Sequence, residues 1–168
     1  HLCQPVWTGA VCLSRKMFDE YEGFKPNLTL GEDFDLWIRI ALKYKVVFLN
    51  ETLSNYNQDA DIKYRGTRTL HHPENHMLWN LDDLAEEETY NPDYKRLIDK
   101  LRSCGLFPYY LSKRYQGDAE KQLLKINWNN ISKEDRRKYA TPVWLQRLLF
   151  YIRTFGLRIK QKILWRKS

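Results

Sequence analysis

The sequence predicts an α/β fold in which a mixed first part is followed by a mostly helical extension. Up to Tyr64, short runs of β-branched and aromatic residues accompany a helical pattern, whereas beyond it the strand signal stops and helical spacing continues. With 43% hydrophobic and 14% aromatic residues, the 168-residue chain has the composition of a folded protein of about one domain.

The first 64 residues contain three predicted strands and one main helix. Apolar and polar residues alternate within 7–15, and runs at 46–49 and 52–56 are typical of short strands. Between them, 33–44 is predicted to be helical, because its apolar residues follow the spacing of one helix face: Phe34, Trp37, Ile38, Ala41 and Leu42. Such a small sheet buries too little area to stand alone, so we expect a partner layer upstream.

The remainder of the chain is predicted to be helical. Helical spacing covers 67–88, 94–104 and 118–128, and Ser132 is placed to cap a further short helix. The expected organisation is therefore a mixed segment at 1–64, a helical extension at 65–142 and a tail helix at 143–168.

The positive charge of the chain is confined to the tail. There are 28 Lys and Arg residues against 21 Asp and Glu, a net charge of +7, and 143–168 holds seven of the basic residues and no acidic one. The rest of the chain is neutral, which argues against a nucleic-acid-binding body.

The tail has the composition of a helix that lies in a membrane interface. Its aliphatic residues fall in one arc, its basic residues lie outside that arc, and Trp144 and Trp165 flank it. We expect contact with an anionic lipid surface through Trp144, Arg147, Arg153, Arg158, Lys160 and Lys162. The alternative is a terminal helix docked on its own protein or on a second subunit, so a homo-oligomer formed through the C-terminal helices stays open.

The expected location is cytoplasmic, at the inner face of a membrane. No run approaches the length of a membrane span, and no signal segment opens the sequence. The first residue is His1 instead of Met, from which we expect a piece of a longer reading frame. Three widely spaced cysteines without a C-x-x-C pair indicate neither a disulfide framework nor a thiolate zinc site, and favour a reducing compartment.

Three carboxylates lie where a loop enters the predicted helix at 33–44. Glu32, Asp33 and Asp35 follow Gly31, and the first two would lie near the free N–H groups and the positive end of the helix dipole. Capping is an alternative role, because Asp33 suits an N-cap and Thr29 with Glu32 suits a capping box.

Four segments in order, 7–11, 18–24, 31–39 and 53–56, resemble the C-terminal, acceptor-side half of a family 2 glycosyltransferase of GT-A fold. The resemblance implies that Asp33 is the general base, which removes the proton from an acceptor hydroxyl. The hydroxyl oxygen attacks the anomeric carbon of a nucleotide sugar, and the configuration of that carbon is inverted. It also implies substrate contacts from Glu32 and Trp37, and from Thr8 and Gly9 in the segment that runs beside the donor sugar, with core packing as the alternative for Trp37. The acceptor would be a saccharide or a lipid-linked sugar in cell-surface polysaccharide synthesis.

The same resemblance implies a divalent cation, Mg²⁺ or Mn²⁺, held mainly by a missing N-terminal half. The D-x-D sequences at 33–35 and 59–61 lie at or after the base motif, so neither is assigned to metal. His71, His72 and His76 are predicted to be ordinary surface residues. The alternative function is a non-catalytic, membrane-peripheral helical module that keeps a glycosyltransferase-like scaffold.

Overall fold

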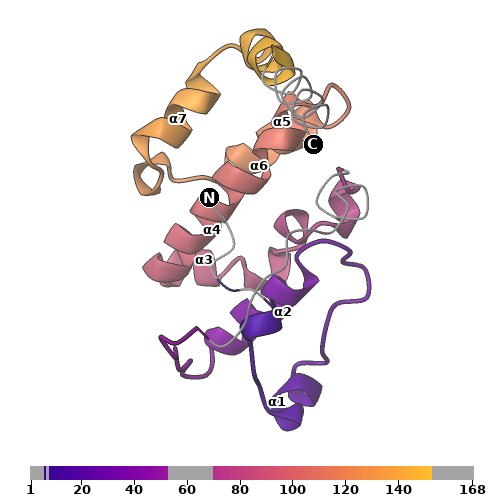
Figure 1. Cartoon of the computed structure of the whole chain (residues 1–168), viewed down its shortest axis with the longest axis vertical. Helices are drawn as coiled ribbons and strands as arrows, with labels where there is room; N and C mark the ends of the chain where they lie inside the picture. The colour runs from indigo at the N-terminus through magenta and orange to yellow at the C-terminus, as the bar shows by residue number, and fades with distance from the viewer. Residues whose placement is uncertain (1–5, 7, 53–69, 153–168) are drawn as a thin grey trace, which may run out of the picture. The chain divides into compact units, whose positions relative to one another are not determined.

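The computed structural model describes residues 6, 8–52 and 70–152 (Figure 1). Of these residues, 62% lie in α- or 3-10 helices, and no β-strand forms among them. The predicted α/β fold with a GT-A type mixed sheet is therefore wrong for the described chain, which is mostly helical.

The predicted strands have no pairing partners among the described residues. Residues 46–49 form neither a helix nor a strand, no backbone hydrogen bond joins 45–52 to another described segment, and the four side chains at 46–49 are 57–90% exposed. In the predicted strand at 7–15, η1 (Thr8–Ala10) is a 3-10 turn, and most of 52–56 lies outside the described residues. Strand propensity alone gives no sheet, because a ladder needs a second strand.

The chain divides into two compact units, residues 1–95 and 96–168. The expected boundary after residue 64 falls outside the described residues, and the one after residue 142 stays a prediction.

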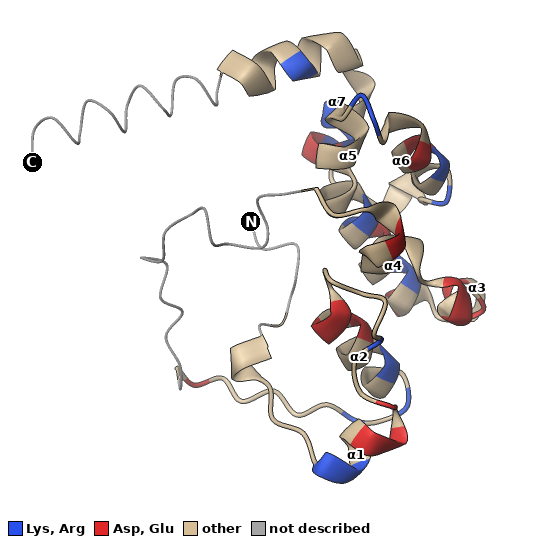
Figure 2. Ribbon diagram, turned by 90° about the vertical axis from the view of Figure 1, so that its right-hand side faces the viewer, with Lys and Arg blue, Asp and Glu red and all other residues tan. Residues whose placement is uncertain are grey.

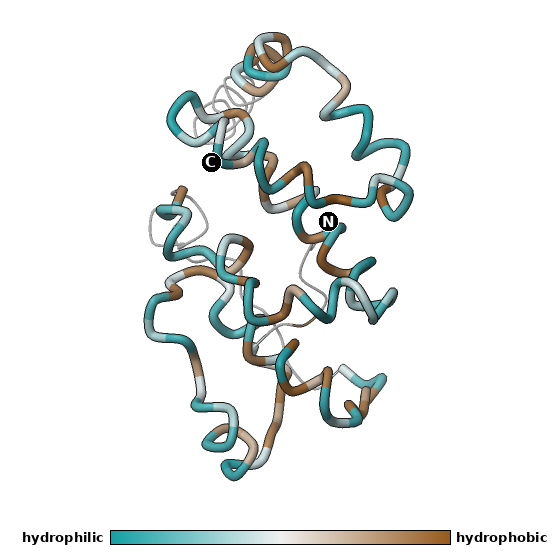
Figure 3. Tube along the Cα trace, turned by 180° about the vertical axis from the view of Figure 1, so that it is seen from behind, coloured by the Kyte–Doolittle hydropathy of each residue, from teal (hydrophilic) through white to brown (hydrophobic). Residues whose placement is uncertain are grey.

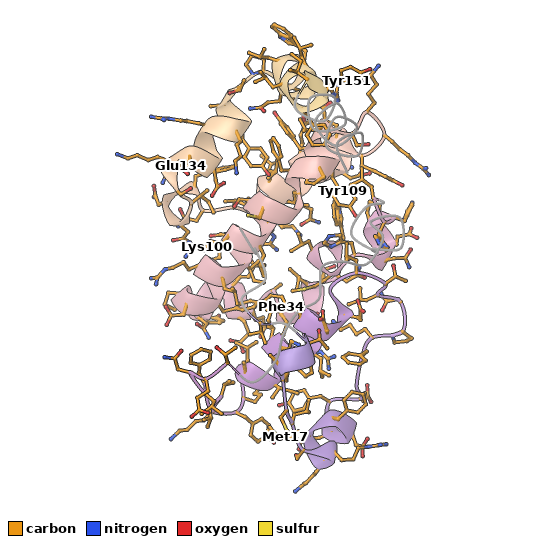
Figure 4. The ribbon with its side chains drawn as sticks, viewed as in Figure 1. Met17, Phe34, Lys100, Tyr109, Glu134 and Tyr151 are labelled. Carbon is orange, nitrogen blue, oxygen red and sulfur yellow. The ribbon has the colours of Figure 1, made fainter. Side chains whose placement is uncertain are left out.

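The first unit is organised around α2 (Glu32–Ala41), which confirms the helix predicted at 33–44. The helix ends three residues early because the chain tightens there, with the N–H of Lys43 bonded to the carbonyl of Ile40 at 3.0 Å. Phe34, labelled in Figure 4, is one of the buried apolar residues of α2, which also include Leu36, Ile38 and Ile40. The other helices of this unit are α1 (Arg15–Glu20), α3 (Glu87–Tyr90) and the first turn of α4 (Pro92–Gly105).

The long helix predicted at 67–88 is wrong for the described residues after 69. The chain there forms three separate 3-10 turns, η4 (Pro73–Asn75), η5 (Met77–Trp79) and η6 (Asp82–Leu84). The ring nitrogens of His72 and His76 accept the N–H groups of Glu74 and Leu78, so η4 and η5 each have their own side-chain cap, whereas η6 has none. Local capping competes with helix propagation, which explains the broken path.

The segment at 73–79 lies beside the loop that leads into α2. The N–H of Thr29 donates to the carbonyl of Asn75 at 2.9 Å, and the N–H of Met77 donates to that of Leu30 at 3.0 Å. An isolated parallel bridge joins Leu30 and His76. These bonds fix the loop from which α2 starts.

The second unit consists of the rest of α4, α5 (Phe107–Leu111), α6 (Gln116–Leu123), η7 (Trp128–Asn130), α7 (Lys133–Ala140) and a helix at 143–152. The predicted helices at 94–104 and 118–128 are confirmed as α4 and α6, although α6 ends at Leu123. Ser132 caps α7 as predicted, because its hydroxyl accepts the N–H of Asp135 at 3.1 Å. The Tyr139 hydroxyl donates to the carbonyl of Ser103 at 2.6 Å and ties α7 to α4.

A buried ion-pair network holds α2 to the loop before it. The side chain of Asp35 is fully buried, with one oxygen 3.0 Å from Lys25 Nζ and the other 2.9 Å from Arg39 Nε. Arg39 also donates to the carbonyls of Tyr21 and Gly23 at 2.6 and 2.8 Å. Burial alone would lower the pKa of Lys25, but hydrogen bonds and charge attraction from Asp83 and Asp35 outweigh it, so this pKa is raised.

The substitution Asp35→Asn should lower the free energy of unfolding by about 3–5 kcal/mol, because it leaves the two cations facing a neutral amide. Urea titration followed by circular dichroism measures the change. Asp19→Asn is the matched control. It removes an exposed carboxylate paired with Arg15 one helical turn away and should cost about 0.5 kcal/mol or less. Equal losses in the two variants would contradict the structural role of Asp35.

Candidate functional site

The predicted catalytic motif lies at the N-terminal end of α2, where acidic residues cluster (Figure 2). Gly31 precedes the helix with a left-handed φ of 83°, and a Cβ added there would lie 2.9 Å from Cβ of Met77. Any other residue at this position would be strained and would collide. Gly31 is therefore required by packing, whatever chemistry follows it.

Asp33 is bonded to another of the predicted site residues. Its Oδ2 accepts the hydroxyl of Thr8, and its Oδ1 accepts the N–H of Phe34 at 2.7 Å. Thr8 lies 25 positions earlier, in the exposed turn η1, which also contains Gly9. The structure thus brings together the residue assigned to acceptor deprotonation and the segment assigned to the donor sugar.

Glu32 lies beside Asp33 in the first turn of α2 and is half-buried. Within the described residues, its carboxylate has no hydrogen bond or ion pair. Both side chains lie at the positive end of the helix dipole, which stabilises anions. A carboxylate has about four lone-pair positions, so Glu32 can accept hydroxyl groups here.

Trp37 lies one turn after Asp33 but packs into the first unit. Its ring meets Phe24 edge to face, with centroids 6.3 Å apart, and Phe24 meets Phe18 in the same way at 5.4 Å. The indole N–H is buried without a hydrogen-bond partner in the described chain. Packing of α2 on the loop before it is thus the contact that the structure shows for Trp37.

No group of three or more His, Cys, Asp or Glu residues in the described ranges is arranged to hold a metal ion. Asp35, the second acid of the D-x-D at 33–35, is committed to Lys25 and Arg39. The D-x-D at 59–61 lies outside the described residues. None of the described residues is assigned to the divalent cation, which the resemblance places mainly in the missing N-terminal half.

The prediction of three surface histidines is wrong for His76, which is only 8% exposed. Its ring packs on Trp79 with centroids 5.3 Å apart and caps η5. Burial, with a smaller effect of the charge of His71, lowers the pKa of His76 to about 4. The ring is therefore neutral in the folded protein at ordinary pH, whereas His71 bonds the hydroxyl of Thr29 at 3.0 Å.

The predicted membrane-contact residues have different positions. Trp144 is exposed, but Arg147 points back into its own unit, with Nε 2.9 Å from the carbonyl of Leu111 and Nη2 2.8 Å from Oε1 of Gln116. The other four predicted contacts, Arg153, Arg158, Lys160 and Lys162, lie outside the described residues. Among the helices that the structure describes, none has the length and apolar character needed to cross a bilayer.

Sequence reasoning missed the two cations that hold α2 in place. Arg39 follows Asp35 by four residues, the spacing at which helical side chains meet, so this pair was open to prediction. Lys25 lies in a loop ten positions before Asp35, and no periodicity indicates such a contact.

Comparisons of this chain with models of protein families, with curated proteins and with solved structures give no match. The function therefore has to be argued from the residues and from their arrangement.

The buried ring of His76 should make the first unit less stable in mild acid. The unfolded state takes up a proton below about pH 6.5, whereas the folded state resists protonation until about pH 4, so stability falls as the pH drops through this window. The total loss is on the order of 3 kcal/mol.

Urea titrations from pH 7 to pH 4 measure this loss. His76→Asn keeps a side-chain acceptor for the cap but does not titrate, so it should flatten the dependence. His72→Asn changes a similar cap whose side chain is 46% exposed and should keep the wild-type dependence. An unchanged slope in His76→Asn would contradict the assignment.

Proposed function

We propose that this chain is the acceptor-side part of an inverting glycosyltransferase, similar to family 2 enzymes in its active-site motif. The hydrogen bond between Thr8 and Asp33 carries the proposal. It joins two residues far apart in sequence that the resemblance places on the two sides of one transfer reaction. The absence of a sheet from the described residues means that fold lends no support, so the proposal rests on this site.

In the proposed reaction, Asp33 removes the proton from an acceptor hydroxyl. The hydroxyl oxygen forms a bond to the anomeric carbon of the donor while the bond from that carbon to the nucleoside diphosphate breaks. The proton goes to the carboxylate, the electron pair of the broken bond leaves with the nucleoside diphosphate, and the configuration of the anomeric carbon is inverted. The bond from Thr8 shows that a hydroxyl can reach Oδ2 of Asp33, as an acceptor hydroxyl would have to do.

Glu32 is the second substrate-binding residue of the proposal. Its carboxylate is adjacent to Asp33 and has no partner among the described residues, so it can accept sugar hydroxyls. The donor is a nucleotide sugar, and the acceptor is a saccharide or a lipid-linked sugar used in a surface polysaccharide. Donor binding and any divalent cation would depend on residues outside this chain.

We place the reaction at the inner face of a membrane, as the sequence suggested. Cys104 is disulfide-bonded in the structure, so the cysteines do not support the reducing compartment expected from their spacing. The positive charge of the chain is concentrated in 143–168, where it can meet anionic headgroups. A lipid-linked acceptor would be presented at that surface.

The competing function is a non-catalytic helical module that keeps the motif as scaffold. It is favoured by the structural roles found for Gly31 and Asp35, since both would be needed without any transfer. The two functions differ in what they require of Asp33.

Asp33→Asn in the protein with its complete reading frame separates them. The amide oxygen can still accept the Thr8 hydroxyl but cannot take a proton, so transfer should fall at least about a hundredfold while the urea midpoint stays unchanged. A radiolabelled nucleotide-sugar assay measures transfer, and Asp19→Asn, on the exposed face of α1, should keep full activity. Undiminished transfer by Asp33→Asn would rule out Asp33 as the base.

A further inference from the structure

The helix at 143–152 exposes a face of large apolar side chains in the second unit. Trp144, Leu148, Leu149 and Ile152 are each 48–66% exposed. The trace coloured by hydropathy shows hydrophobic positions along this helix (Figure 3). At 100° per residue, the four positions fall within an arc of about 140°, so they form one surface, here called the tail face.

The orientation of the tail face is fixed by polar contacts on the opposite flank. Arg147 bonds to α5 and α6 through Leu111 and Gln116, and the amide of Gln146 donates to the carbonyl of Lys138 in α7 at 2.9 Å. These contacts anchor the first turn of the helix to its unit. Rotation about the helix axis would break them, so the four apolar side chains are held outward.

Charge indicates what the tail face meets. Arg147 is the only charged residue of 143–152, and six more basic residues and no acidic residue follow in 153–168. A second copy docking through the same face would bring two such tails together, seven positive charges against seven. A nucleic acid would match the charge but offers no apolar layer for four large side chains.

We infer that the tail face docks on the surface of an anionic lipid bilayer, with its aliphatic and indole side chains below the headgroups. A helix with exposed apolar side chains and flanking cations is suited to this surface, and Phe150 and Tyr151 are also exposed, outside the arc of the tail face. Each basic residue near anionic lipid strengthens binding about fivefold. The inference refines the membrane location proposed above and names its contact surface. It also assigns Arg147 to positioning of the helix, in contrast to the lipid contact predicted from sequence.

Sedimentation of the full chain with vesicles tests the inference. The chain should bind vesicles of phosphatidylcholine with phosphatidylglycerol and bind phosphatidylcholine alone at least tenfold more weakly. Raising the salt from about 0.05 M to about 0.5 M should release it, because headgroup attraction is screened. Binding that ignores both lipid charge and salt would overturn the electrostatic part.

The double substitution Leu148→Gln and Leu149→Gln tests the face itself. It should weaken binding to the anionic vesicles at least tenfold, since two buried aliphatic side chains are lost from the lipid. Leu124→Gln is the matched control, because Leu124 is an 86% exposed leucine of the same unit outside the tail, and it should bind as the wild type does. Wild-type binding by the double variant would overturn the assignment of the face.

Two further measurements separate the remaining outcomes. If the wild type sediments as a dimer without lipid and the double variant as a monomer, the face belongs to a second copy and the lipid inference is wrong. Asp33→Asn should bind vesicles as the wild type does, whereas the double variant should keep transfer to a soluble acceptor. Failure of the lipid inference is therefore distinguishable from failure of the proposed transferase activity.

Discussion

The buried charge of Asp35 is the constraint on which the first unit depends. A carboxylate without access to water is tolerated only when both oxygens are paired, and here Lys25 and Arg39 take one each. Arg39 then reaches two loop carbonyls, so one side chain sets the rotation of α2 against the preceding loop. That rotation decides which residues of α2 are buried and which remain accessible at its N-terminal end.

The acidic motif at the start of α2 therefore has two separate physical roles. Asp33 and Asp35 are two positions apart, about 200° around a helix, so they point to opposite sides and do not act as a pair. Asp35 holds the structure, whereas Asp33 and Glu32 stay at the helix end with capacity to accept hydroxyls. The same spacing explains why this D-x-D offers no chelating site.

Sequence patterns predicted the features that depend on nearby residues. The apolar spacing of α2, the extent of α4 and the Ser132 cap of α7 are all encoded within a few positions, and each was confirmed. The predicted sheet was wrong, because residues 46–49 have strand propensity but a strand ladder also needs a partner elsewhere in the chain. The helix predicted at 67–88 was wrong for another reason. The rings of His72 and His76 cap two successive 3-10 turns and so interrupt the helix that the apolar spacing favours. The resemblance assigned Thr8 and Asp33 to one active site, but nothing in the sequence predicted the hydrogen bond between them.

Gly31 has a consequence for how such motifs are used in assigning function. Its left-handed backbone and its closeness to Met77 exclude any side chain at this position, and Asp35 and Arg39 are needed for the buried ion pair. A chain that transferred no sugar would therefore still need these three residues of the motif. A signature search that scores Gly31, Asp35 and Arg39 along with Asp33 measures mainly whether this helix is seated in the same way. The informative positions are the two whose removal leaves the packing intact, Glu32 and Asp33.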